Sequence, residues 1–205
     1  LGPDDVAGYL DAVGLSGLDV AAQVHRRCDG SPLLLTELVG LLLDHSGDPD
    51  ALERLPDSLT AVIEARLDQL GTARTVLERA AVIGTSFSVD HLARIADTGT
   101  DQLLDGLHTS LRFGVVDEPT PGRYRFRHAL VAETAARALS ASERTRLHLR
   151  TAEVLERAGP GTIDRSVAVT EAARHRVAAL PGGDPAAAAA ACLAAAELTS
   201  AAIAD

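Results

Sequence analysis

Residues 115–127 read VVDEPTPGRYRFR, and here the periodicity of the chain changes from helical to extended. The Pro-Thr-Pro-Gly segment at 119–122 predicts a turn, and its flanks predict two short strands. Because side chains alternate along a strand, Tyr124 and Phe126 are expected on one face and three arginines on the other. These arginines are Arg123, Arg125 and Arg127. Three short helices are expected before the hairpin, and this order predicts a winged helix.

Helical periodicity dominates the rest of the chain, so the fold is expected to be mainly α. The helices before the hairpin are expected at residues 3–13, 18–28, 33–44, 58–70, 73–83, 89–96 and 101–111. Those after it are expected at 129–139, 142–158, 165–180 and 185–203. The last of these is very rich in alanine, and alanine-lined paired helices pack closely, as the first units of an α-solenoid would.

Composition excludes several functions. The chain has 205 residues and a net charge of −10, which argues against broad attraction to nucleic acid or anionic lipid. All 19 basic residues are arginine. A P-loop and Schiff-base chemistry both need lysine, so neither belongs to this chain. The sequence also lacks HExxH and GxSxG motifs. We therefore expect no catalytic residues, no metal site and no enzymatic activity of its own.

The expected setting is the cytoplasm of a cell. No apolar stretch approaches the ~20 residues that a membrane helix needs, so no membrane segment is expected. Cys28 and Cys192 lie far apart and fit no metal spacing, which favours reduced, structural thiols. The chain begins with Leu1 and contains no methionine, so we expect it to be a piece of a longer protein.

Two helix starts could face a ligand. Gly30, Ser31 and Pro32 precede a leucine-rich helix, with Ser31 as a candidate cap and Pro32 in the first helical position. His128 stands where the second strand of the hairpin turns into a helix. Helix starts favour anions and polar ligands, although helix ends far outnumber ligand sites. The other six histidines are expected at the surface.

A winged helix also suggests DNA binding, which is kept as an alternative. Residues 72–139 hold eight arginines and eight acidic residues, and the third helix, where a DNA reader places its recognition residues, carries Asp101 and Asp105. Carboxylates there would repel phosphates, whereas the arginines of the hairpin could contact a nucleic-acid backbone. A helical protein-interaction scaffold is the other alternative.

The order of five segments resembles the region after the nucleotide-binding core of STAND-class (AAA-type) ATPases, and above all LuxR-type, MalT-like transcriptional regulators of high-GC bacteria. The segments are LGPDDVAGYLDAV, CDGSPLLLTELV, LPDSLTAVIEARLDQL, VLERAAVIGTSFSVDHLARIA and YRFRHALVAETAARAL. The resemblance spans about residues 1–160 and implies a helical lid at 1–56, a connector helix and winged helix at 57–140, and the start of a tetratricopeptide-like (TPR-like) sensor array at 141–205.

The resemblance also implies a binding site for ATP or ADP, with Mg²⁺ held by a core outside this chain. In that class the proline of a GxP motif lies against the adenine, and Gly30 and Pro32 match the motif. A histidine at the start of the last winged-helix helix contacts the ADP phosphate, and His128 matches it, although Ala129 and Leu130 follow and the motif's aspartate is absent. The expected partners are an unknown inducer at the repeats, a second copy of the protein, and DNA through a separate domain.

Overall fold

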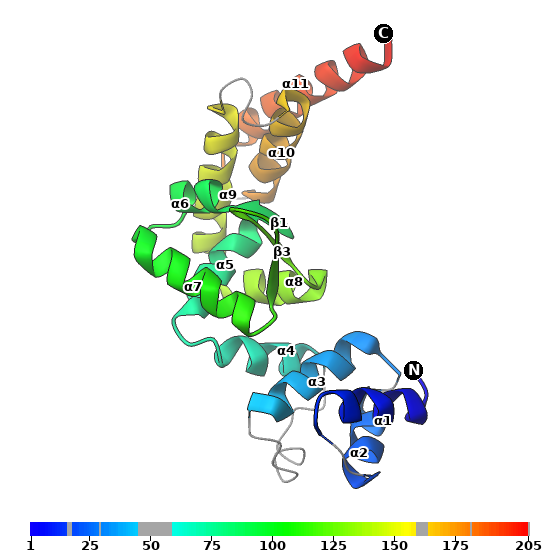
Figure 1. Cartoon of the computed structure of the whole chain (residues 1–205). Coiled ribbons are helices and arrows are strands. Elements are labelled where there is room, and N and C mark those ends of the chain that lie inside the picture. Colours follow the sequence, from blue (N-terminus) through cyan, green and yellow to red (C-terminus); the bar gives the residue numbers. More distant parts are fainter. Residues whose placement is uncertain (16–17, 29, 45–58, 159–163, 181, 205) are drawn as a thin grey trace. The chain divides into compact units, whose positions relative to one another are not determined.

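A computed structural model describes the chain except residues 16–17, 29, 45–58, 159–163, 181 and 205. The described residues form eleven helices and one small antiparallel sheet of three strands, so the expectation of a mainly α fold is confirmed (Figure 1). The chain divides into two compact units, Leu1–Arg74 and Thr75–Asp205.

The first unit contains helices α1 (Pro3–Ala12), α2 (Leu18–Cys28), α3 (Pro32–Asp44) and α4 (Leu59–Asp68). The start of α1 follows from Pro3 in the first turn and from Asp5, whose carboxylate accepts a hydrogen bond from the Gly2 amide at 2.8 Å. Apolar side chains of all four helices form one core, and α3 is largely buried, as its leucines predict. Buried members of that core include Val6, Leu10, Val24, Cys28, Leu35, Leu38, Leu41, Leu42 and Val62.

The second unit begins with the winged helix. Its elements are α5 (Ala73–Ile83), β1 (Ser86–Ser88), α6 (Val89–Ile95), α7 (Thr100–Arg112), β2 (Val116–Thr120) and β3 (Arg123–Phe126). The strand order is β1-β3-β2, so β3 is the central strand and pairs with both neighbours. The hairpin was predicted, but β1 was not, because three residues are too few to show a two-residue period.

The buried face of the sheet is aromatic. Tyr124 and Phe126 are buried and the arginines between and beside them are exposed, which confirms the predicted alternation. Phe87 of β1 completes the cluster, with its ring centroid 5.8 Å from those of both Tyr124 and Phe126. On the helical side, Gly106 of α7 allows a close approach to α5, because a Cβ there would lie 2.7 Å from Val76 Cγ2.

Four helices follow the hairpin: α8 (Ala129–Ala138), α9 (Ala141–Glu156), α10 (Arg165–Ala178) and α11 (Pro185–Ala204). α9 packs against α6 and α10, and α10 packs against α11. Ser140 and Asp164 cap α9 and α10, respectively, by accepting hydrogen bonds from the amides of the first turn. These contacts do not establish a repeating array, so the TPR-like sensor stays a prediction.

The predicted domains divide the chain differently from the two observed units. α4, predicted as a connector, lies in the first unit, whereas the winged helix and the C-terminal helices share the second. The predicted boundary at residues 56–57 lies outside the described residues. Among the helices that the structure describes, none combines the length and the apolar character needed to cross a membrane.

Candidate functional site

The start of α3, in the first unit, has the predicted cap. The Ser31 hydroxyl accepts a hydrogen bond from the Leu34 amide at 3.3 Å, and Pro32 occupies the first helical position, where its missing N–H costs nothing. Pro32 is exposed, and Gly30 adopts a φ of +72°, a conformation that favours glycine. The Ser31 amide donates a hydrogen bond to the Cys28 carbonyl at 2.7 Å, and the Pro32 ring lies on the surface.

His128, in the second unit, is the N-cap residue of α8, as predicted. Its backbone is extended, with φ −135° and ψ 133°, and its side chain makes no capping hydrogen bond to the helix amides. The ring is half-buried. A histidine in this position can donate a hydrogen bond to an anion near the start of α8. The first helical residues, Ala129 and Leu130, carry no charge that would compete with it.

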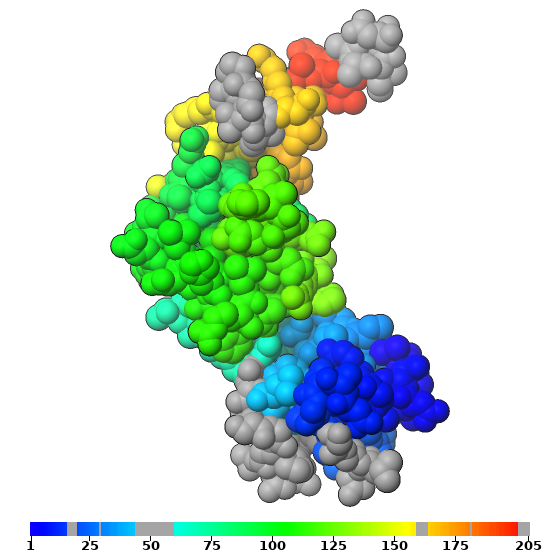
Figure 2. Space-filling view, viewed as in Figure 1, coloured from blue at the N-terminus to red at the C-terminus, as the bar shows by residue number. Residues whose placement is uncertain are grey.

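The arginines of the hairpin do not form a free cationic stripe. Arg127 Nε donates a hydrogen bond to Asp117 Oδ1 at 2.9 Å, and Asp117 is also the register partner of Arg125. On α7, Asp101 and Asp105 are exposed. Figure 2 shows α7 and the hairpin, both green, on one face of the second unit. The exposed side chains of α7 and the hairpin thus include carboxylates as well as arginines.

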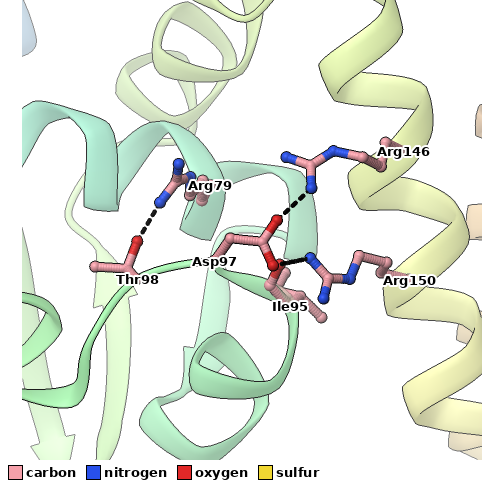
Figure 3. A network of polar contacts seen from close by, with 6 residues as sticks. All are labelled: Arg79, Ile95, Asp97, Thr98, Arg146 and Arg150. Atoms are coloured by element: carbon pink, nitrogen blue, oxygen red, sulfur yellow. Dashed lines mark hydrogen bonds and ion pairs between the residues drawn. The ribbon is translucent and has the colours of Figure 1, made fainter.

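A polar network that the sequence did not predict joins the winged helix to α9 (Figure 3). Asp97, in the connection between α6 and α7, accepts hydrogen bonds from Arg146 and Arg150 of α9. These bonds, that from Arg150 first, lower the pKa of Asp97 to about 2. Next to it, the guanidinium of Arg79 on α5 donates to the hydroxyl of Thr98. Two helices, α5 and α9, thus contribute three arginines to one short connection.

The Asp97 network could not be read from sequence spacing. Asp97 lies 49 residues from Arg146 and 53 from Arg150. The only local signal is that the two arginines are four apart, and so share one face of a helix.

A second unpredicted cluster contains histidines. His148 of α9 and His175 of α10 approach each other with their Nδ1 atoms 2.8 Å apart, and Arg174 Nη2 lies 3.0 Å from the other ring nitrogen of His175. Burial, followed by the charge of Arg174, lowers the pKa of His175 to about 3 and that of His148 to about 4. Both imidazoles are therefore neutral at pH 7.

Two expectations about the scattered histidines and cysteines are wrong. His175 is 1% exposed, and His91 is partly buried, with an Nε2 atom that has no hydrogen-bond partner among the described residues. The spacing offered a signal for His175, because it lies seven residues after the buried Ala168 and so shares its helix face. Of the two cysteines, Cys28 is buried as expected, whereas Cys192 is exposed.

The described residues contain no group of three or more histidine, cysteine or acidic side chains placed to hold a metal ion. Gly30 and Pro32 belong to the first unit and His128 to the second. Each of these predicted ligand residues stands at the start of a helix, and its contact with nucleotide stays a prediction.

Comparison with known proteins finds a distant relative. A curated protein of Rhizobium meliloti (strain 1021), described as uncharacterized, is 33% identical to the chain over 144 residues. The match covers 64% of this chain but only 14% of the relative, so the chain spans about one seventh of the relative's length. No protein-family model and no solved structure matches the chain.

Proposed function

We propose that the chain is the regulatory part of an ATP/ADP-dependent transcriptional regulator of the STAND class, LuxR-type and MalT-like. In this proposal the first unit is the lid of a nucleotide-binding core, the winged helix contacts the bound nucleotide, and the C-terminal helices begin a sensor for an inducer. The core, with its P-loop and Mg²⁺, and the DNA reader are separate segments of a longer cytoplasmic protein. Self-association belongs to the same proposal.

The observation that carries the proposal is the position of His128. It is the N-cap of the helix after the wing, yet its ring does not cap the helix amides. The order of elements supports the same reading, with a four-helix unit, a winged helix and paired helices following one another. The Rhizobium relative is about seven times as long as the matched region, which gives it room for further segments.

The physical basis of the switch is a difference in contacts. A ligand shifts a conformational equilibrium only as far as its contacts differ between the two states. A hydrogen bond from His128 to the ADP phosphate in the closed state would supply such a difference. Adenine packing on Pro32 would add affinity, because the exposed pyrrolidine ring offers an apolar surface.

The test is nucleotide retention by the full-length protein. His128→Ala is expected to purify with less ADP and to raise transcription without inducer, whereas His108→Ala, at an exposed position of α7, leaves both unchanged. Nucleotide released from the purified proteins is quantified by chromatography. Equal ADP content in the wild type and the His128→Ala variant, or a wild type that purifies without nucleotide, contradicts the proposal.

A second pair of variants tests the lid. Pro32 and Pro185 are both exposed prolines in the first position of a helix, so replacing either with alanine has the same local effect on its helix. Pro32→Ala is expected to weaken ADP binding several-fold, and Pro185→Ala is the matched control. Equal ADP affinity of the two variants would remove Pro32 from the site.

DNA binding by the winged helix itself remains a second candidate, favoured by the exposed Arg123 and Arg125 on the outer face of β3. It predicts salt-sensitive binding of duplex DNA by residues 1–205 that is lost when the two arginines are replaced by glutamine. A mobility-shift assay at low salt distinguishes the candidates, because the regulatory proposal places DNA binding in a separate domain.

A further inference from the structure

A groove of about 660 Å³ lies along α9, beside the turn that joins α10 to α11. Its wall is formed by Ser142, Thr145, Arg146, Leu149, Arg150 and Gly182, among others. Glycine is required at 182, because a Cβ there would lie 2.9 Å from Thr145 Cγ2. The turn can therefore approach α9 closely enough to close one side of the groove.

The groove combines an apolar wall with cationic donors. Leu149 and the Thr145 methyl group supply apolar surface, and the Ser142 and Thr145 hydroxyls lie among them. The Arg146 and Arg150 side chains are 47% and 37% exposed. Each contacts Asp97 through Nη1, and a guanidinium has five N–H donors, so donors remain on both for a second oxyanion within the described contacts.

Charged side chains of both signs surround this groove. They are Arg79, Arg146, Arg150, Arg157 and Arg176, and Asp97, Glu143, Glu153, Glu156 and Asp184. Glu153, which lines the groove, is paired with Arg157 at 3.5 Å. The charge of Arg146 and Arg150 is thus shared by one principal counterion, Asp97.

We propose that this groove binds a small oxyanion with a short apolar chain, whose headgroup pairs with Arg146 and Arg150 in competition with Asp97. The apolar chain lies on Leu149 and the Thr145 methyl group, where it is removed from water. A carboxylate and a phosphate monoester share this chemistry, because guanidinium groups bind both oxyanions.

Ligand binding has a structural consequence within the second unit. Asp97 precedes α7, and its two ion pairs link that connection to α9 (Figure 3). A ligand that takes over the two arginines weakens this link and leaves Thr98 held by Arg79. The site thus connects ligand binding on α9 to the position of α7, and it does not depend on nucleotide binding at His128.

The experiment titrates residues 1–205 with butanoate, hexanoate, inorganic phosphate and butyl phosphate, followed by ligand-observed NMR and calorimetry. We expect saturable binding of hexanoate or butyl phosphate, and at least tenfold weaker binding when Arg146 and Arg150 are both replaced by glutamine. Arg137→Gln, which removes an exposed arginine paired with Glu133, is the matched control and leaves binding unchanged. The carboxylate and phosphate series identify which headgroup is preferred.

Asp97→Asn provides the decisive variant, because it removes the competing anion without removing a groove residue. The affinity for the probe should rise about fivefold, as expected for the loss of exposed ion pairs. Far-UV circular dichroism checks that each variant is folded. Unchanged or weaker binding by Asp97→Asn, equal loss in Arg137→Gln, equal affinity for inorganic and butyl phosphate, or no binding of any probe would overturn the proposal.

Discussion

The Nδ1 atoms of His148 and His175 lie 2.8 Å apart, so one ring must donate a proton and the other must accept it. Arg174 decides the direction. Its Nη2 lies 3.0 Å from Nε2 of His175, and a guanidinium can only donate. We therefore assign Nε2 of His175 as the acceptor and place its hydrogen on Nδ1.

The first prediction concerns these tautomers. His175 should carry its hydrogen on Nδ1 and His148 on Nε2, which makes a donor chain from Arg174 through His175 to His148. Long-range ¹H–¹⁵N correlation spectra of the imidazoles at pH 7 report the two forms directly. A hydrogen on Nε2 of His175 would show that the chain runs differently. The exposed His108 serves as the reference ring.

The second prediction is a loss of stability in mild acid. A histidine of an unfolded chain has a pKa of about 6.5, whereas the folded pKa is about 3 for His175 and about 4 for His148. Above the unfolded pKa both states hold neutral rings, and the full stability is present. As the pH falls below it toward the folded values, the unfolded chain takes up protons first, and stability is lost.

The slope of that loss can be measured. As the pH falls, each proton that only the unfolded chain binds lowers the free energy of unfolding by about 1.4 kcal/mol per pH unit. His148 is half-buried, so solvent screening should reduce its share, and the slope for the two histidines together should be less than twice that of one proton. Urea unfolding between pH 7 and pH 4 gives the slope, which should flatten when both residues are replaced by glutamine. An equal flattening by His108→Gln would refute the assignment.

The third prediction concerns Asp97. Because the folded pKa of about 2 lies below the usual value, its ion pairs stabilise the protein above about pH 4 and are lost as the pH falls toward 2. Asp97→Asn should therefore lower the urea midpoint at pH 7 and leave it nearly equal to wild type at pH 2. The control is Asp105→Asn, at an exposed position of α7. If the urea midpoints of Asp97→Asn and wild type differed by the same amount at pH 7 and pH 2, the stabilisation by Asp97 would not be electrostatic.

The fourth prediction uses two helical glycines with opposite surroundings. Gly106→Ala should destabilise the second unit by about 1–2 kcal/mol, because the strain of overpacking against Val76 exceeds the gain in helix propensity. Gly8→Ala, with nothing within 4 Å, should stabilise the first unit by about 0.5–1 kcal/mol. Hydrogen exchange resolves the two units. Adding Gly106→Ala to Val76→Ala should cost less than adding it to wild type, and an equal cost would contradict the packing argument.

Local chemistry made much of the fold predictable. Pro32 and Pro185 each mark the first position of a helix, because a proline lacks only an N–H that is unsatisfied there. Tyr124 and Phe126 alternate with exposed arginines, since a two-residue period turns one face of β3 toward the core. The placement of Gly30, Pro32 and His128 at helix starts followed in the same way. Their contact with a nucleotide remains a proposal.

Other features have no local signature. β1 is a strand because Phe87 packs on the rings of β3 and its backbone pairs with that strand. The same three residues without that partner would carry no strand pattern. The burial of His175 likewise depends on α9 lying against α10. The position of His175 on the buried face of α10 was therefore only a weak signal in the sequence.

The sequence by itself determined where the helices and the hairpin lie, because capping, proline geometry and side-chain alternation act over a few residues. Only the tertiary structure decided which distant side chains meet. Asp97 contacts Arg146 and Arg150, which lie some fifty residues away in the sequence, and His148 contacts His175, 27 residues away. Both contacts form because α9 packs against α6 and α10. The energy of such contacts depends on burial and distance, which no local spacing specifies.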